Sequence, residues 1–465
     1  MSARGTAAPR GVLSQRLNDR SGLLAGILLA FLMLVGGGGS PAPLAELACE
    51  LLAAIVAIAW LWENPHAVSQ DNRTLHWLVL LVVAVPMAQL IPLPPTLWRA
   101  LPGRETMAAA LDLIGRGGEW HAVSIAPHRT LASLLSLGPP LLMLVLAARL
   151  GSRPAARLAQ IVAAIAVLAV VVGAGQLAQR TGGPLDFYAT GEAGTLHGFQ
   201  ANRNTAADVL LIGLVALAAV WRARRDVHTG AGDAVFVVLG LILLLGVVLT
   251  GSRTGIAMAP LALAFVVAIV EPSVRLARST WRALLAGVTA ISGALALAAF
   301  ALRDNAILGR VIARFGLSGE FRPELWRDTW FAIRGFWPVG SGLGTFIPAF
   351  LPAERLEVVD ATLPHRAHNE LLELALEGGI VLLLCWAVLA FIVLRAWLRA
   401  WGVRDPATRP LLLLAAAIVT VGGLHSLVDY PLRSMAMAAL VAMGAGLAIG
   451  AASRAAGPRP STDDA

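Results

Sequence analysis

Twelve long apolar runs constrain the fold of this chain more than any other feature. A membrane-spanning helix needs about 20 mostly apolar residues, since each residue rises about 1.5 Å through a hydrocarbon core of about 30 Å. The chain is 57% apolar and only 14% charged, and soluble proteins carry about 25% charged residues. The predicted spans are residues 21–36, 43–62, 75–93, 131–149, 156–177, 205–221, 234–250, 255–271, 284–302, 372–394, 411–428 and 434–452. We therefore expect an all-α polytopic membrane protein with about 12 transmembrane helices.

The distribution of arginine predicts how these spans are oriented. An even number of spans places both termini on one side of the membrane. If that side is the cytoplasm, 20 of the 36 arginines are cytoplasmic and 16 face outward, eight of them within residues 303–371. Long segments do not count in the positive-inside rule, so the comparison is 20 against 8. We expect both termini in the cytoplasm.

The predicted spans divide the chain into four parts. Residues 1–302 carry the first nine spans, 303–371 form a large outward segment, 372–452 carry the last three spans, and 453–465 form a polar tail that we expect to be disordered. Apolar residues at helical spacing from Ile307 predict amphipathic helix within 303–371, and Trp326, Trp330 and Trp337 share one face. Such a helix lies along the membrane interface or covers a cavity.

The first polar cluster precedes the sixth span. Asn202, Arg203 and Asn204 place many hydrogen-bond donors at a helix N-terminus, where the helix dipole also favours an anion. Helix capping explains the asparagines equally well, but a cap does not need Arg203. Asp208 lies one turn further along the same helix.

The second cluster is a short turn between two apolar runs, and it contains Ser252 and Arg253. Both runs are near the minimum length for spanning, so the turn should hold Arg253 at the bilayer surface or in a cavity. Snorkelling of the arginine to the interface is the alternative.

The third cluster joins His365, His368 and Asn369 to the start of the tenth span, with Glu377 two turns further on. A histidine at the mouth of a helix can take a proton from a hydroxyl group, although an ordinary interfacial histidine is the commoner case. His365 and His368 lack a third ligand at suitable spacing, so we expect no metal site.

Two further polar groups stay open to structural explanations. Asp429 and Arg433 are spaced to pair across Pro431, which favours a structural role. Glu46 and Glu50 share one face of the second span, where they form either a proton relay or the wall of a polar cavity.

Several motifs, in this order along the chain, resemble the bacterial O-antigen ligase and polymerase superfamily, which includes Wzy-type polymerases. The resemblance covers roughly residues 120–435, and Thr205 departs from the histidine of several relatives. The motifs are Trp120 with 124–127 (SIAP), 199–204 (FQANRN), 251–255 (GSRTG), 327–346 (RDTWFA…WPVGSGLGTF), 368–371 (HNEL), 377–379 (EGG) and 425–433 (HSLVDYPLR).

The resemblance implies a GT-C-like glycosyltransferase of the bacterial inner membrane that works at the periplasmic face without a metal or other cofactor. The donor would be a glycan on undecaprenyl diphosphate, and the acceptor another glycan or lipid A core. Arg203 and Arg253 would hold the diphosphate, and His368 would activate the acceptor hydroxyl. Contacts to substrate are expected from Asn202, Asn204, Ser252, Arg327, Trp330, His365, Asn369 and Glu377. A chain-length regulator or other polysaccharide-assembly proteins are expected partners.

Other functions remain open at this point. No residue separates a polymerase from a ligase. A proton-coupled transporter using Glu46, Glu50 and Asp208 predicts inverted repeats, which the sequence lacks. A non-catalytic assembly protein leaves the outward arginines of residues 303–371 unexplained.

Overall fold

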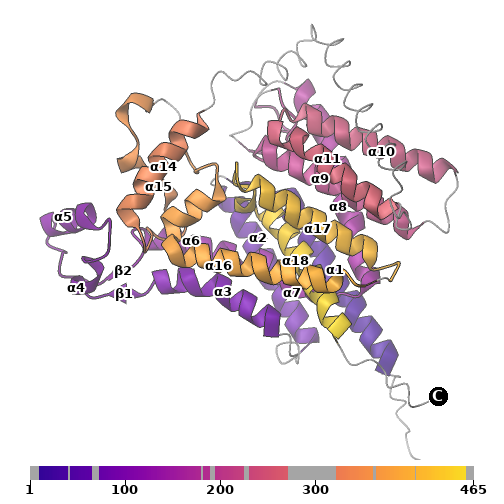
Figure 1. Cartoon of the computed structure of the whole chain (residues 1–465), viewed down its shortest axis with the longest axis horizontal. Helices are drawn as coiled ribbons and strands as arrows, with labels where there is room; N and C mark the ends of the chain where they lie inside the picture. The colour runs from indigo at the N-terminus through magenta and orange to yellow at the C-terminus, as the bar shows by residue number, and fades with distance from the viewer. Residues whose placement is uncertain are drawn as a thin grey trace, which may run out of the picture.

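The computed structural model describes residues 10–39, 42–64, 73–179, 182–188, 194–224, 230–270, 321–359, 363–403 and 405–456. Its long helices are α1 (Arg10–Val35), α2 (Pro43–Glu63), α3 (Arg73–Gln89), α6 (Pro127–Ser136), α7 (Gly138–Arg149), α8 (Ser152–Ala178), α9 (Arg203–Ala223), α10 (Gly230–Leu249), α11 (Arg253–Val270), α16 (Glu370–Ala400), α17 (Arg409–His425) and α18 (Met435–Ala456). They form one bundle, in which α1 begins and α18 ends on the same side (Figure 1).

The prediction of an all-α polytopic membrane protein is confirmed. Within the described ranges, nine helical segments are long and apolar enough to span a membrane, with α6 and α7 counted together, and α3 and α17 are shorter apolar helices. These segments account for eleven of the twelve predicted runs. The twelfth run, 284–302, and the helix predicted from Ile307 lie outside the described residues, as does the tail beyond residue 456.

The short elements cluster at one end of the bundle. They are α4 (Pro95–Trp98), α5 (Glu105–Leu113), the antiparallel strands β1 (Pro92–Leu93) and β2 (His121–Ala122), α14 (Arg322–Phe336), α15 (Phe346–Phe350) and the 3₁₀ turns η3 (Leu351–Ala353), η4 (Leu356–Val358) and η5 (Pro431–Arg433). Figure 1 shows α14 and α15 next to the start of α16, while α4 and α5 project beyond α3. A buried apolar cluster, including Leu325, Phe346 and Leu376, joins α14 and α15 to α16.

Small residues allow the central helices to pack closely. In α18, Gly446 and Gly450 form a Gly-x-x-x-Gly pair against α7, where an added methyl group would lie 2.6 Å from the carbonyl oxygen of Leu144 and 2.0 Å from that of Ala148. Hydrocarbon chains solvate apolar side chains well, so close backbone packing replaces the hydrophobic effect as the main attraction between such helices. The α7–α18 contact therefore fixes the centre of the bundle on which the polar end is built.

A kink in α16 opens space for the segment that follows α14. Gly379 has φ +55° and ψ −147° inside the helix, a conformation essentially restricted to glycine. Its backbone lies against Pro338, whose carbonyl oxygen accepts a hydrogen bond from the Ile380 amide at 3.0 Å. The amides of Ser341 and Gly342 donate to the carbonyl oxygens of Leu376 and Glu377. The 337–344 loop is thereby fixed against the first turns of α16.

Candidate active site

A buried carboxylate, Asp429, joins three segments that are far apart in the sequence. His368 contacts Asp429 through Nδ1 at 2.9 Å, and the side-chain amides of Asn202 and Asn204 donate to the second carboxylate oxygen, Asn202 at 3.3 Å. Asp429 is 1% exposed. The turns before α9, before α16 and after α17 therefore converge on one acceptor.

His368 occupies a strained position beside this acceptor. Its φ of +49° is the one positive value among the described non-glycine residues, and such a conformation costs about 1–3 kcal/mol. The ring packs edge-on against Phe321 and Tyr430, with centroids 5.2 and 4.7 Å away. Its side chain is 22% exposed, so the ring is reachable from outside the protein.

The backbone on both sides of His368 is tied to neighbouring elements, which explains how the strain is maintained. The indole of Trp326 on α14 donates to the carbonyl oxygen of Ala367 at 3.0 Å, and the Ala367 amide donates to Glu373 at 3.1 Å. Asn369 caps α16 by accepting from the amides of Leu371 and Leu372. The side chain of Asn369, for which the sequence predicts a substrate contact, is thus the cap of α16 in the structure.

The surroundings of Asp429 keep its carboxylate ionised. Burial by itself raises the pKa of Asp429, but the hydrogen bonds from His368 and the Asn204 amide, with His425 close by, hold that pKa below its usual range. Burial also raises the pKa of the neighbouring Tyr430 to about 12. The phenol is therefore protonated at neutral pH, and the imidazole and carboxylate are the groups available for proton transfer.

A second histidine–carboxylate pair lies close to Asp429, whose amide donates to the carbonyl oxygen of His425 at 2.9 Å. His425, the last residue of α17, contacts Asp208 of α9 through Nδ1 at 2.7 Å, and both side chains are fully buried. Within the described part of the chain, Nε2 of His425 and Oδ2 of Asp208 have no hydrogen-bond partner. Sequence reasoning noted both residues but did not pair them, because 217 positions separate them in the chain.

Three glutamates on one face of α16 surround Arg433. The guanidinium of Arg433 lies 3.2 Å from Glu370, 3.3 Å from Glu373 and 3.2 Å from Glu377, and Arg366 pairs with Glu373 at 2.9 Å. Burial by itself lowers the pKa of Arg433, but the carboxylates raise it above its ordinary value. The predicted pairing of Asp429 with Arg433 is wrong, because η5 directs Arg433 toward α16 and leaves Asp429 to His368 and the asparagines.

The two arginines predicted to bind diphosphate begin neighbouring helices. Arg203 is the first residue of α9 and Arg253 the first residue of α11, and both are partly buried. The helices meet at their first turns, because Gly255 packs against the Cβ atom of Ala207. Asn202 caps α9 and Ser252 caps the start of α11 by accepting from the Gly255 amide at 3.0 Å. Asn202 therefore serves both as a cap and as a ligand of Asp429.

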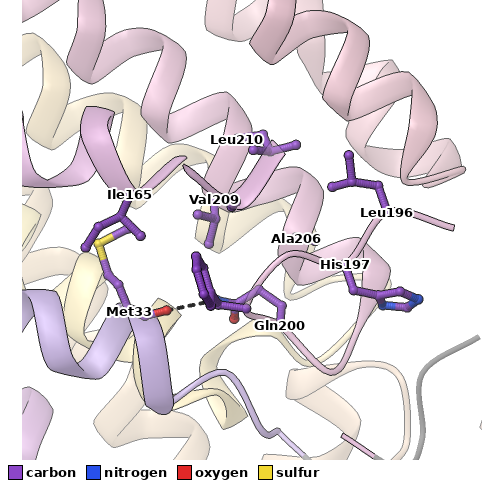
Figure 2. A pocket seen from close by; sticks show the side chains of 10 residues that line it. Met33, Ile165, Leu196, His197, Gln200, Ala206, Val209 and Leu210 are labelled. Carbon is purple, nitrogen blue, oxygen red and sulfur yellow. Dashed lines mark hydrogen bonds between the residues drawn. The ribbon is translucent and has the colours of Figure 1, made fainter. Parts of the chain in front are cut away.

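The loop that leads into Arg203 is anchored on α1. Figure 2 shows Gln200 directed toward Met33, whose carbonyl oxygen accepts a hydrogen bond from its amide at 3.5 Å. The Ala201 amide also donates to the carbonyl oxygen of Gly37 at 2.9 Å. A methyl group on Gly37 would overlap Phe199, so the loop needs glycine at that position. These contacts set the position of Asn202 and Arg203.

The remaining predicted site residues have different surroundings. Glu377 is fully buried and accepts from the Phe346 amide at 3.1 Å as well as from Arg433, so it anchors the 337–346 segment. Arg327, Trp330 and His365 are exposed. Of the three tryptophans predicted to share a face, Trp326 is hydrogen-bonded inward while Trp330 and Trp337 are exposed.

A cavity of about 300 Å³ lies beside the Arg433 cluster. Its wall is mainly apolar and comes from several elements, including α2, α3, α6, α7, α16 and α18, and its charged residues are Glu46, Arg366, Glu370 and Arg433. This position favours the cavity-wall interpretation of Glu46. A space that is charged at one end and apolar along its length suits an amphiphile.

Taken together, these features define a polytopic membrane protein with a polar, partly open site at one end of its bundle. Residues 238–387 match the model of the O-antigen ligase family, a stretch that includes Arg253, His368 and Glu377. This match supports the O-antigen ligase and polymerase superfamily that the sequence motifs predicted. No curated protein matches the chain.

We expect Arg433→Gln to destabilise the protein by about 3–5 kcal/mol, because among the described residues it leaves three buried carboxylates with Arg366 as the one cation still paired with them. Thermal unfolding in detergent measures the loss. Arg334→Gln, at an exposed position of α14, is the matched control. Adding Glu370→Gln to Arg433→Gln should recover part of the stability. An unchanged unfolding midpoint in Arg433→Gln would show that the cluster does not support the fold.

Proposed function

We propose that this protein transfers a glycan from undecaprenyl diphosphate to a hydroxyl group of an acceptor sugar, at the periplasmic face and without a metal ion. The family match supports a ligase or polymerase type of activity in general. The contact between His368 and ionised Asp429 is the single observation on which the proposed chemistry rests. The acceptor is either a growing glycan or lipid A core, and no residue favours one of them.

His368 acts as the general base in this proposal. With its Nδ1–H donated to Asp429, the imidazole carries its lone pair on Nε2. As the acceptor oxygen attacks the anomeric carbon, its proton passes to Nε2 and the imidazolium is stabilised by Asp429. The strained backbone and the edge-on contacts of Phe321 and Tyr430 hold the ring in one orientation.

Arg203 and Arg253 bind the leaving group. When the bond between the anomeric carbon and the diphosphate oxygen breaks, the electron pair remains on the diphosphate. Guanidinium groups can hold such a group with bidentate hydrogen bonds. The first turns of α9 and α11 add their helix dipoles to the same region. The contact between these two turns supports a shared anion site.

The transporter alternative has less support. It requires a chain of exchangeable carboxylates that includes Glu46 and Asp208. Asp208 is instead paired with His425, and both side chains are fully buried. Glu46 of α2 lines the cavity beside the Arg433 cluster. These two positions do not form one continuous path.

The direct test uses purified protein and a synthetic undecaprenyl-diphosphate glycan, with the products separated on a gel and EDTA in one arm. The proposal expects lengthened or transferred glycan at the same rate with and without EDTA. Absence of product with either class of acceptor would contradict glycosyl transfer, and loss of product in EDTA alone would contradict metal independence.

His368→Ala should abolish the polymer or ligated glycan in a knockout strain while the protein remains at its normal level in the membrane, because it removes the imidazole that takes the hydroxyl proton. Immunoblotting measures the protein, and gel analysis of surface glycan measures the product. His76→Ala is the matched control, because this histidine is exposed near the start of α3 and is far from His368 along the chain. Near-normal product from His368→Ala would rule out the assigned base.

Arg203→Lys should lower the transfer rate on the order of 10²-fold, because lysine keeps the charge but lacks the bidentate fork. Arg222→Lys, at the other end of the same helix α9, should leave the rate unchanged. The measurement is the initial rate with purified protein at saturating donor. A full rate for Arg203→Lys would refute the diphosphate role.

A further inference from the structure

A groove lies between α3, α16 and α18, apart from the cavity beside the Arg433 cluster, and its volume is about 680 Å³. It runs along α3 from Arg73 to Ala84 and along α16 from Val388 to Arg399, with the last turns of α18 behind it. Because α3 runs toward the candidate site and α16 runs away from it, the arginine end is the end remote from that site (Figure 1). None of the proposed transfer chemistry uses this groove.

The charged residues that line the groove are all arginines, and they lie at one of its ends. Arg73, Arg395 and Arg399 lie at its remote end, and no carboxylate is among the described residues that line it. Arg395 and Arg399 are four residues apart on α16, so both project from the same face of the helix. Like charges at this spacing repel each other, and an anion placed between them relieves the repulsion.

The length of the groove matches one leaflet of a bilayer. Eleven residues separate the two ends on each helix, which gives about 16 Å at about 1.5 Å per residue. The hydrocarbon core is about 30 Å thick, so this length is close to half of it. The walls along this length are apolar, and Trp77, Leu80 and Phe391 are each more than half exposed.

We propose that this groove binds one anionic phospholipid in the leaflet opposite the candidate site. The phosphate group lies among Arg73, Arg395 and Arg399, and the acyl chains lie along the apolar wall between α3 and α16. Basic pockets between transmembrane helices bind anionic headgroups in this way, with each arginine adding to the attraction. A free phosphate ion would use only the arginine end and leave the apolar wall without an occupant.

The test is native mass spectrometry of the detergent-purified full chain after incubation with phosphatidylglycerol or with phosphatidylcholine of the same acyl chains. We expect retention of one phosphatidylglycerol and much weaker retention of phosphatidylcholine. The R395Q/R399Q variant should bind phosphatidylglycerol roughly tenfold more weakly or worse. The R222Q/R224Q variant, with two arginines removed from the end of α9, should bind as the wild type does. Ala84→Trp, which fills the apolar wall, should reduce binding without any change of charge.

Three results would overturn the proposal. Equal retention of the two phospholipids would show that charge does not select the occupant. Unchanged phosphatidylglycerol binding by R395Q/R399Q would show that these arginines only extend to the bilayer surface. Displacement of the lipid by millimolar inorganic phosphate alone would show an anion site without a lipid. Thermal unfolding of each variant without added lipid confirms that the compared proteins are folded.

Discussion

The contacts of Asp429 are the interaction on which the geometry of the polar end depends. A buried carboxylate is costly unless hydrogen bonds and positive charge compensate it. Here the compensation comes from His368 before α16, from Asn202 and Asn204 at the start of α9, and from the nearby His425 at the end of α17. The same contacts bring three distant turns together. The hydrogen bonds that stabilise the buried carboxylate therefore also assemble the site.

The cluster of Arg433 with Glu370, Glu373 and Glu377 also positions the segments around His368. Three glutamates at successive turns of α16 contact Arg433 and so hold η5 in place. Glu377 also accepts from the Phe346 amide, and Glu373 accepts from the Ala367 amide, so α15 and the residue before His368 are held against α16. The kink at Gly379 admits the 337–344 loop against these same turns. His368 is thus held between two polar clusters, which explains how a strained non-glycine backbone persists there.

Much of this architecture could be predicted from the sequence, because it depends on local patterns. Apolar runs of about 20 residues identify spans regardless of tertiary contacts, and the motifs around Arg253 and His368 predicted the superfamily that the family match supports. The pairing of polar groups could not be predicted in the same way. Asp429 and Arg433 have a spacing suited to a local ion pair, but the turn at Pro431 sends the two side chains to partners on different helices. Asp208 and His425 meet only because α9 and α17 pack together, and no local pattern reports that contact.

The measurement that bears most directly on the proposed chemistry is the initial rate of transfer by the wild type and by Asp429→Asn. Since the pKa of Asp429 lies below its ordinary value of about 3.9, its carboxylate is ionised at neutral pH in the wild type. The account predicts for Asp429→Asn a rate lower by about 10²–10⁴-fold, because the amide neither fixes the tautomer of His368 nor stabilises the imidazolium. An Asp429→Asn protein with the rate of the wild type would contradict it.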